Sequence, residues 1–288
     1  MAVTYKEIFE DAFLELNQAN IEAARDEALL LFSKHINKDR SYIISRMDEA
    51  LPTEFNQKSF TDLIKRRSKH EPFAYLYNER EFFNRPFKVG PGVLIPRPET
   101  EHLIEKVVEE NAKRPFKNIT DICCGSGIIG ITLQKELGIN VQMFDISKEA
   151  LAWAERNVNF HNVRNSVKIK QCDILKDYSL IDTHTDCITM NPPYICPNEI
   201  PSLNPDVIEY EPLLALDGGE KEGLEFTLKC IHNFAQIVAN HTHLFIELGY
   251  KQKNLLESQS LYPWTIQNWK KDLAGIPRVV HLIKNQNG

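Results

Sequence analysis

The chain has 288 residues, of which 42% are hydrophobic and 26% charged, a balance typical of a globular protein with room for a medium domain and a smaller one. No apolar run approaches the ~20 residues of a membrane-spanning helix, and the amino terminus is acidic and amphipathic, unlike a secretory or transit signal. The net charge of −6 argues against nucleic acid as the main substrate, because duplex affinity depends on neutralising phosphates. The six cysteines form no CxxC pair, which indicates reduced thiols and a cytoplasmic protein.

Residues 1–72 have the pattern of a helical domain. Thr4 and Glu7 are spaced as a capping box, and apolar residues follow at the spacing of one helix face. Basic residues crowd the end of the last helix, which Pro72 terminates; we favour an interaction with the helix dipole over a patch for an anionic partner. Further helices are expected at residues 21–36, 41–49 and 53–69.

Residues 73–98 carry aromatics, glycines and several prolines, which predict a short hairpin followed by an ordered loop at a domain junction. Beyond this junction, strand-like and helix-like stretches alternate, as in a mostly parallel sheet covered by helices. The final two strands are expected to close the sheet as an antiparallel pair. Strands are predicted at residues 119–122, 141–146, 167–171, 185–190, 243–248, 264–269 and 278–283.

A glycine-rich loop follows the first of these strands. Gly125-x-Gly127-x-x-Gly130 runs from the strand into a helix, and Asp145 ends the next strand, where a carboxylate can accept hydrogen bonds from ribose hydroxyls. This motif alone would also fit a nicotinamide-dependent enzyme. The residues expected to contact the nucleotide part of a cofactor are Cys123, Cys124, Gly125, Ser126, Gly127, Asp145 and, beside the adenine, Ile174. Asn191, after the fourth strand, is a further expected cofactor contact.

The most specific motif is Asn191-Pro-Pro-Tyr194, placed at the carboxyl end of the fourth strand. Two prolines stiffen the turn, so the Asn191 side-chain oxygen and the Pro192 carbonyl are two fixed acceptors for a planar NH2 group, on which Tyr194 can stack. Such a clamp suits methyl transfer to a conjugated amine and favours S-adenosylmethionine as the cofactor. It would equally hold the amino group of adenine or cytosine, and a catalytically idle adaptor could also retain it.

With these motifs the chain resembles, over nearly its whole length, the HemK-type protein-(glutamine-N5) methyltransferases, which methylate a glutamine in peptide-chain release factors. The resemblance implies a Rossmann-like class I methyltransferase domain at residues 99–288 and a helical domain at residues 1–72 that helps to receive the release factor. It also implies catalytic and substrate-binding roles for Asn191, Pro192, Pro193 and Tyr194. By the same resemblance Arg97 and Glu99 are expected to bind substrate, near the methionine end of the cofactor or at the domain junction. The matching segments are Glu81–Phe83, Leu94–Glu101, Asp121–Gly127, Phe144–Ser147, Asn191–Ile195, Tyr210–Pro212, Leu216–Gly219, Glu247–Tyr250 and Asp272–Val279.

The sequence departs from the family pattern at two places. Cys123 and Cys124 replace a common Gly-Thr pair, and Asn78 replaces a common glycine at a position where Asn tolerates a left-handed backbone. We expect no metal site: the alternating Asp182, His184 and Asp186 lie in a polar loop without a further ligand. His241 and His243 are expected at the solvent-exposed end of a strand.

Overall fold

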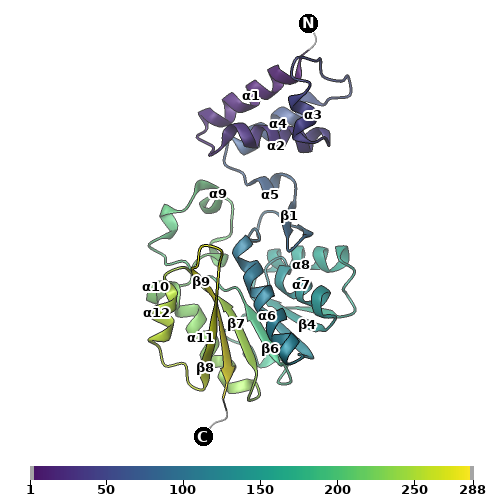
Figure 1. Cartoon of the computed structure of the whole chain (residues 1–288). Coiled ribbons are helices and arrows are strands. Elements are labelled where there is room, and N and C mark those ends of the chain that lie inside the picture. The colour runs from purple at the N-terminus through teal and green to yellow at the C-terminus, as the bar shows by residue number, and fades with distance from the viewer. Residues whose placement is uncertain (1–2, 286–288) are drawn as a thin grey trace. The chain divides into compact units, whose positions relative to one another are not determined.

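The computed structural model describes residues 3–285 and forms two compact units, each described by itself (Figure 1). The first unit comprises Met1–Tyr77 and, from much later in the chain, Pro205–Tyr210. The second comprises Asn78–Asn204 and Glu211–Gly288. Within the described range, no helix is both long enough and apolar enough to cross a membrane.

The first unit is helical. The Thr4 side chain accepts the Glu7 N–H at 3.2 Å and the Glu7 carboxylate accepts the Thr4 N–H at 2.8 Å, which confirms the capping box. The fourth helix begins later than predicted, because the Asn56 side chain caps it by accepting the Ser59 N–H. The helices are α1 (Tyr5–Gln18), α2 (Ala24–Ile36), α3 (Arg40–Ile44), α4 (Gln57–Arg67), α5 (Phe73–Leu76) and α9 (Pro205–Ile208).

The basic end of α4 is largely occupied by ion pairs inside this unit. The Arg67 side chain is 6% exposed and pairs with Glu27 and, at 2.9 Å, with Asp206. Arg66 pairs with Glu71. These carboxylates, as well as the helix dipole, neutralise the cluster of positive charge.

The second unit contains a hairpin and a seven-stranded sheet in the order β5-β4-β3-β6-β7-β9-β8. The first five strands of this order run parallel, and β9 pairs antiparallel with both β7 and β8, as the sequence predicted. Asn78, just before the hairpin, has the expected left-handed backbone with φ 51°. The strands are β1 (Glu79–Phe82), β2 (Arg85–Lys88), β3 (Asn118–Ile122), β4 (Asn140–Asp145), β5 (Val167–Gln171), β6 (Cys187–Met190), β7 (His243–Glu247), β8 (Trp264–Lys271) and β9 (Pro277–Lys284).

Helices cover both faces of the sheet (Figure 1). Alternate residues of β7 show the two layers: Phe245 packs in one apolar cluster with α6, α7 and α8, and Leu244 and Ile246 pack in another with α11 and α12. The helices are α6 (Glu101–Lys113), α7 (Ile128–Leu137), α8 (Lys148–Phe160), α10 (Glu220–Gly223), α11 (Glu225–Ile237) and α12 (Gln252–Glu257).

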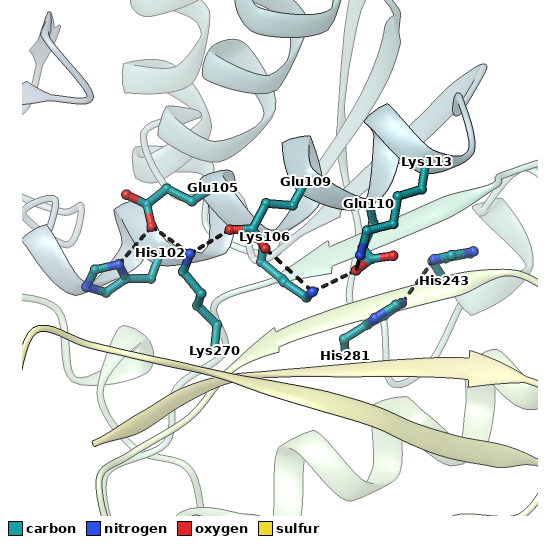
Figure 2. A network of polar contacts seen from close by, with 9 residues as sticks. All are labelled: His102, Glu105, Lys106, Glu109, Glu110, Lys113, His243, Lys270 and His281. Carbon is teal, nitrogen blue, oxygen red and sulfur yellow. Dashed lines mark hydrogen bonds and ion pairs between the residues drawn. The ribbon is translucent and has the colours of Figure 1, made fainter. Parts of the chain in front are cut away.

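A chain of polar contacts lies between α6 and the antiparallel strands (Figure 2). Lys106 and Lys113 donate hydrogen bonds to the Glu110 carboxylate at 2.6 and 2.9 Å. Burial disfavours ionisation of Glu110, but these two ammonium groups outweigh it and lower its pKa to about 2. Lys270 of β8 donates a hydrogen bond to the carboxylate of Glu109, also on α6, at 2.7 Å. The network ties the first long helix of this unit to the last strands.

Beside this network lie two stacked histidines, His243 of β7 and His281 of β9, whose ring nitrogens lie 3.0 Å apart (Figure 2). The expectation that His243 lies at a solvent-exposed strand end is wrong, because it is 5% exposed and packs edge-on against Phe116. Burial, together with the charge of His243, lowers the pKa of His281 to about 3. Both imidazoles are therefore neutral partners at physiological pH.

Candidate active site

A cavity of about 330 Å³ opens at the carboxyl ends of the parallel strands, where the strand order changes direction between β3 and β6. Ligands of open α/β sheets bind at such a point, and the volume suits a small molecule. Of the residues predicted from sequence, the cavity is lined by Arg97, Cys123, Cys124, Gly125, Ser126, Asp145, Ile174, Asn191 and Pro193. Glu99, Gly127, Pro192 and Tyr194 are outside its lining.

The loop after β3 approaches the cavity with its backbone. Cys123, Gly125 and Gly127 all have left-handed conformations, with φ of 57°, 55° and 83°. Cys123 thus adopts a left-handed conformation that favours glycine, which costs a residue with a side chain about 1–2 kcal/mol. Gly127 caps α7, and a Cβ there would come within 3.1 Å of Met143. Gly127 therefore shapes the loop without lining the cavity.

Two carboxylates, those of the partly buried Asp145 and the buried Asp121, hold this loop. Asp145 accepts the Gly125 N–H at 2.8 Å with one oxygen and the Ser147 N–H at 2.9 Å with the other. Beneath them, Asp121 is fully buried and accepts the Gly130 N–H at 3.0 Å. Burial raises the pKa of Asp121 to about 7, against the opposing effect of its hydrogen bonds. The carboxylates fix the loop backbone before any ligand binds.

Asn191 lies directly after β6 and lines the cavity. Its side-chain NH2 group donates to the Thr100 hydroxyl at 3.1 Å. Its side-chain oxygen makes no hydrogen bond within residues 3–285 and remains an available acceptor. The Tyr194 hydroxyl donates to Glu247 at 3.4 Å, and burial raises the pKa of this phenol far above its usual value.

Two glycines allow the backbone of this segment to be packed closely. A Cβ on Gly218 would lie 2.7 Å from the Tyr194 Cα, and one on Gly223 would lie 2.2 Å from the Tyr194 carbonyl oxygen. The Tyr194 carbonyl also accepts a hydrogen bond from Gln252 at 2.8 Å. Gly218, which belongs to the Leu216–Gly219 motif, and Gly223 thus let the chain pack closely against the segment after β6.

Arg97 lines the cavity while its guanidinium is paired with Glu211 at 2.5 Å. The second oxygen of Glu211 accepts the Ile95 N–H at 3.0 Å, and the Glu211 side chain is 1% exposed. The proline-rich segment before α6 is therefore held to the segment after α9 by a single buried carboxylate.

The alternating acidic and histidine residues before β6 have structural partners. Asp186 accepts the backbone N–H groups of Lys117 and Asn118, and Asp182 accepts that of His184. Across residues 3–285, no group of three or more His, Cys, Asp or Glu side chains could hold a metal ion.

Comparison with known proteins finds family models that match both parts of the chain. The model of the PrmC N-terminal domain matches residues 7–77, and that of the methyltransferase small domain matches residues 98–204. The chain is 35% identical over 278 residues to the release factor glutamine methyltransferase of Clostridium botulinum, covering 96% of this chain and 97% of that protein. It is 38% identical over 230 residues to that of Thermodesulfovibrio yellowstonii, covering 78% and 81%.

This chain belongs to the release factor glutamine methyltransferase family. The resemblance found in the sequence is confirmed, and the protein is a methyltransferase. Among solved structures, a methyltransferase from Pyrococcus furiosus superposes with a TM-score of 0.52 at 17% identity, covering 73% of this chain and 95% of that one. That likeness confirms the Rossmann-like class I fold of the second unit.

Several residues of this candidate site were not assigned a role from the sequence. Thr100 and Glu247 contact the Asn191-Pro-Pro-Tyr194 segment, and Glu211 holds Arg97. All three lie within segments that carry the family resemblance, which was the only signal available for them. Further unpredicted lining residues are Ile146, Pro212, Leu214, Asp217 and Phe226.

Proposed function

We propose that this protein uses S-adenosylmethionine to methylate the side-chain amide nitrogen of a glutamine in a peptide chain release factor, at the cavity between β3 and β6. The single observation that carries the proposal is the state of Asn191. It lies on the cavity wall with its NH2 group bound to Thr100, and its oxygen has no hydrogen-bond donor among the described residues. That oxygen is the acceptor a substrate amide requires.

The lining residues fit the cofactor. Each oxygen of Asp145 accepts one backbone N–H and retains a lone pair for a ribose hydroxyl. Ile174 and the 42% exposed Ile146 offer apolar surface for an adenine ring. The loop from Cys123 to Gly127 lets its backbone approach the ligand. Bound there, S-adenosylmethionine would supply an electrophilic methyl group.

On the substrate side, the Asn191 oxygen and the Pro192 carbonyl accept the two hydrogens of the glutamine amide. Accepting both pushes electron density onto the amide nitrogen and aims its lone pair, so positioning is the main catalytic device. Pro193 stiffens the turn, and Tyr194 covers the planar amide. We assign Arg97 to the methionine end of the cofactor, because it lines the cavity, and Glu99 to the approach of the substrate.

The helical first unit is assigned to recognition of the release factor. Its side chains form their own apolar core, and the cavity is built from the second unit. One glutamine side chain supplies little binding energy, so affinity for the whole protein must come from a wider surface. A substrate of this kind places the enzyme in the cytoplasm.

Incubation of the purified chain with S-adenosylmethionine carrying a labelled methyl group tests this function. Release factor and duplex DNA are offered in parallel, and mass spectrometry locates the methyl group. We expect label on a glutamine of the release factor. Label on adenine or cytosine would establish the nucleic-acid alternative, and binding of cofactor without transfer to either substrate would establish an idle adaptor.

A further inference from the structure

We propose that Thr100 and Glu247 are positioning residues that set the orientation of the Asn191 amide, so that its oxygen and not its NH2 group faces the substrate. The inference deepens the proposed function and rests on it. An asparagine amide is nearly symmetric in shape, and rotation by half a turn exchanges its acceptor for its donors. A flipped Asn191 would present NH2 to the NH2 of glutamine and could not hold it.

The geometry around Thr100 decides between the two orientations. Its hydroxyl receives the Asn191 NH2 group at 3.1 Å and is fully buried in the 3₁₀ helix η1 (Pro98–Thr100). Toward Asn191, the hydroxyl can either accept from the NH2 group with a lone pair or donate its one hydrogen to the side-chain oxygen. If another group takes the Thr100 hydrogen, only lone pairs remain for Asn191, and the amide must turn its NH2 group toward Thr100.

Glu247, the last residue of β7, is the group placed to take that hydrogen. It is 1% exposed, and one of its oxygens makes no hydrogen bond within the described part of the chain. The Thr100 hydroxyl lies close enough to stabilise its charged form. An ionised carboxylate only accepts, so the Thr100 hydroxyl, by turning its hydrogen toward the unpartnered oxygen of Glu247, keeps only lone pairs for Asn191.

The Glu247 carboxylate also contacts Tyr194, the last residue of the Asn191-Pro-Pro-Tyr194 segment. Its second oxygen accepts the Tyr194 hydroxyl at 3.4 Å. Glu247 thus lies behind both Asn191, through Thr100, and Tyr194, which it contacts directly. One buried charge holds the two side chains that grip the substrate amide.

The orientation should therefore depend on pH. Burial raises the pKa of Glu247 to about 7; the nearby Glu99 raises it further, and Thr100, Arg278 and Tyr194 oppose that rise. Below this pH the protonated carboxyl can itself donate, and the Thr100 hydroxyl is then free to donate to a flipped Asn191. Turnover should fall as Glu247 becomes protonated.

The test measures kcat, the KM for release factor and, by calorimetry, the Kd for S-adenosylmethionine in wild type, T100V, T100S and E247Q. T100V keeps the shape and removes the hydroxyl, and should lower kcat on the order of tenfold to a hundredfold at unchanged cofactor Kd. T100S should recover most of that loss. T132V is the matched control, because Thr132 is equally buried and its hydroxyl has no hydrogen-bond partner in residues 3–285; its kcat should stay at the wild-type value.

The pH profile separates positioning from mere support of the fold. Wild-type kcat should rise with pH around 7, and that rise should be absent in E247Q, which cannot ionise. Wild-type kcat in T100V, or equal profiles in wild type and E247Q, would overturn the inference; should T100V fail to fold, the profiles decide alone. Wild-type enzyme is assayed first, since its failure to methylate release factor would refute the proposed function instead.

Discussion

Asp145→Asn tests the assignment of the cofactor cavity with a nearly isosteric change. The wild-type carboxylate accepts the Gly125 and Ser147 N–H groups at 2.8 and 2.9 Å. An asparagine has one acceptor oxygen, so one of these N–H groups would face an NH2 group instead. Hydrogen bonds to a charged group contribute about 1.5–3 kcal/mol, and a lost ribose contact adds to the effect on binding. We expect the Kd for S-adenosylmethionine to rise roughly tenfold to a hundredfold.

Isothermal titration calorimetry measures this Kd, and circular dichroism checks that the variant is folded. Asp182→Asn is the matched control, because Asp182 also accepts a backbone N–H, that of His184 at 2.9 Å, but does not line the cavity. Its cofactor Kd should not change. An unchanged Kd in folded Asp145→Asn would refute the placement of the ribose at Asp145.

Asn191→Ala should lower kcat on the order of a hundredfold, while the Kd for S-adenosylmethionine, measured by calorimetry, changes less. Near-normal turnover would refute the role of Asn191 in holding the substrate amide. On the first unit, Leu14→Ser and Ile44→Ser, at sites 49% and 57% exposed, should raise the KM for release factor. Leu273→Ser, at a fully exposed site of the second unit, is the control and should leave this KM at the wild-type value. If the first two variants also kept the wild-type KM, the first unit would have no role in recognition. The pKa of His281 falls from 6.5 to about 3 on folding, so the unfolded chain binds more protons between these pH values, and urea titration should show about 2 kcal/mol less stability at pH 5 than at neutral pH (Figure 2). In His281→Phe this loss should be reduced by most of that amount, and an unchanged pH dependence would contradict the cause assigned to it.

Most of the sheet was predictable because its signals are local. Apolar runs of strand length alternate with helical periodicity, and the strand at Val167–Gln171 has the predicted bounds. Helix ends were harder. The helix expected at residues 41–49 ends at Ile44, and the one expected from residue 53 begins only after its N-cap, Asn56. Capping depends on side-chain geometry, which the apolar periodicity of a sequence does not report.

The loop after β3, Asp145 and Asn191 were predicted as site residues because each is part of a short motif with a chemical reason for its residue types. Thr100 and Glu247 were not. Each reaches Asn191 or Tyr194 only through the packing of η1 and β7 beside β6, at separations of 91 residues for Thr100 and 53 for Glu247. No local pattern distinguishes a threonine that holds an asparagine from one that completes a turn.

The segment Pro205–Tyr210 has a consequence for the order in which the protein is made. It belongs to the first unit, where Asp206 pairs with Arg67 and with His70, a residue 136 positions earlier in the chain. A ribosome adds about 5–20 residues per second, so roughly 6 to 27 seconds pass between the synthesis of Tyr77 and that of these last partners. Of the two carboxylates that pair with the Arg67 guanidinium within residues 3–285, Glu27 is the one already synthesised during that interval. The amino-terminal unit is therefore the first to begin folding and cannot be completed until most of the methyltransferase sheet has been synthesised.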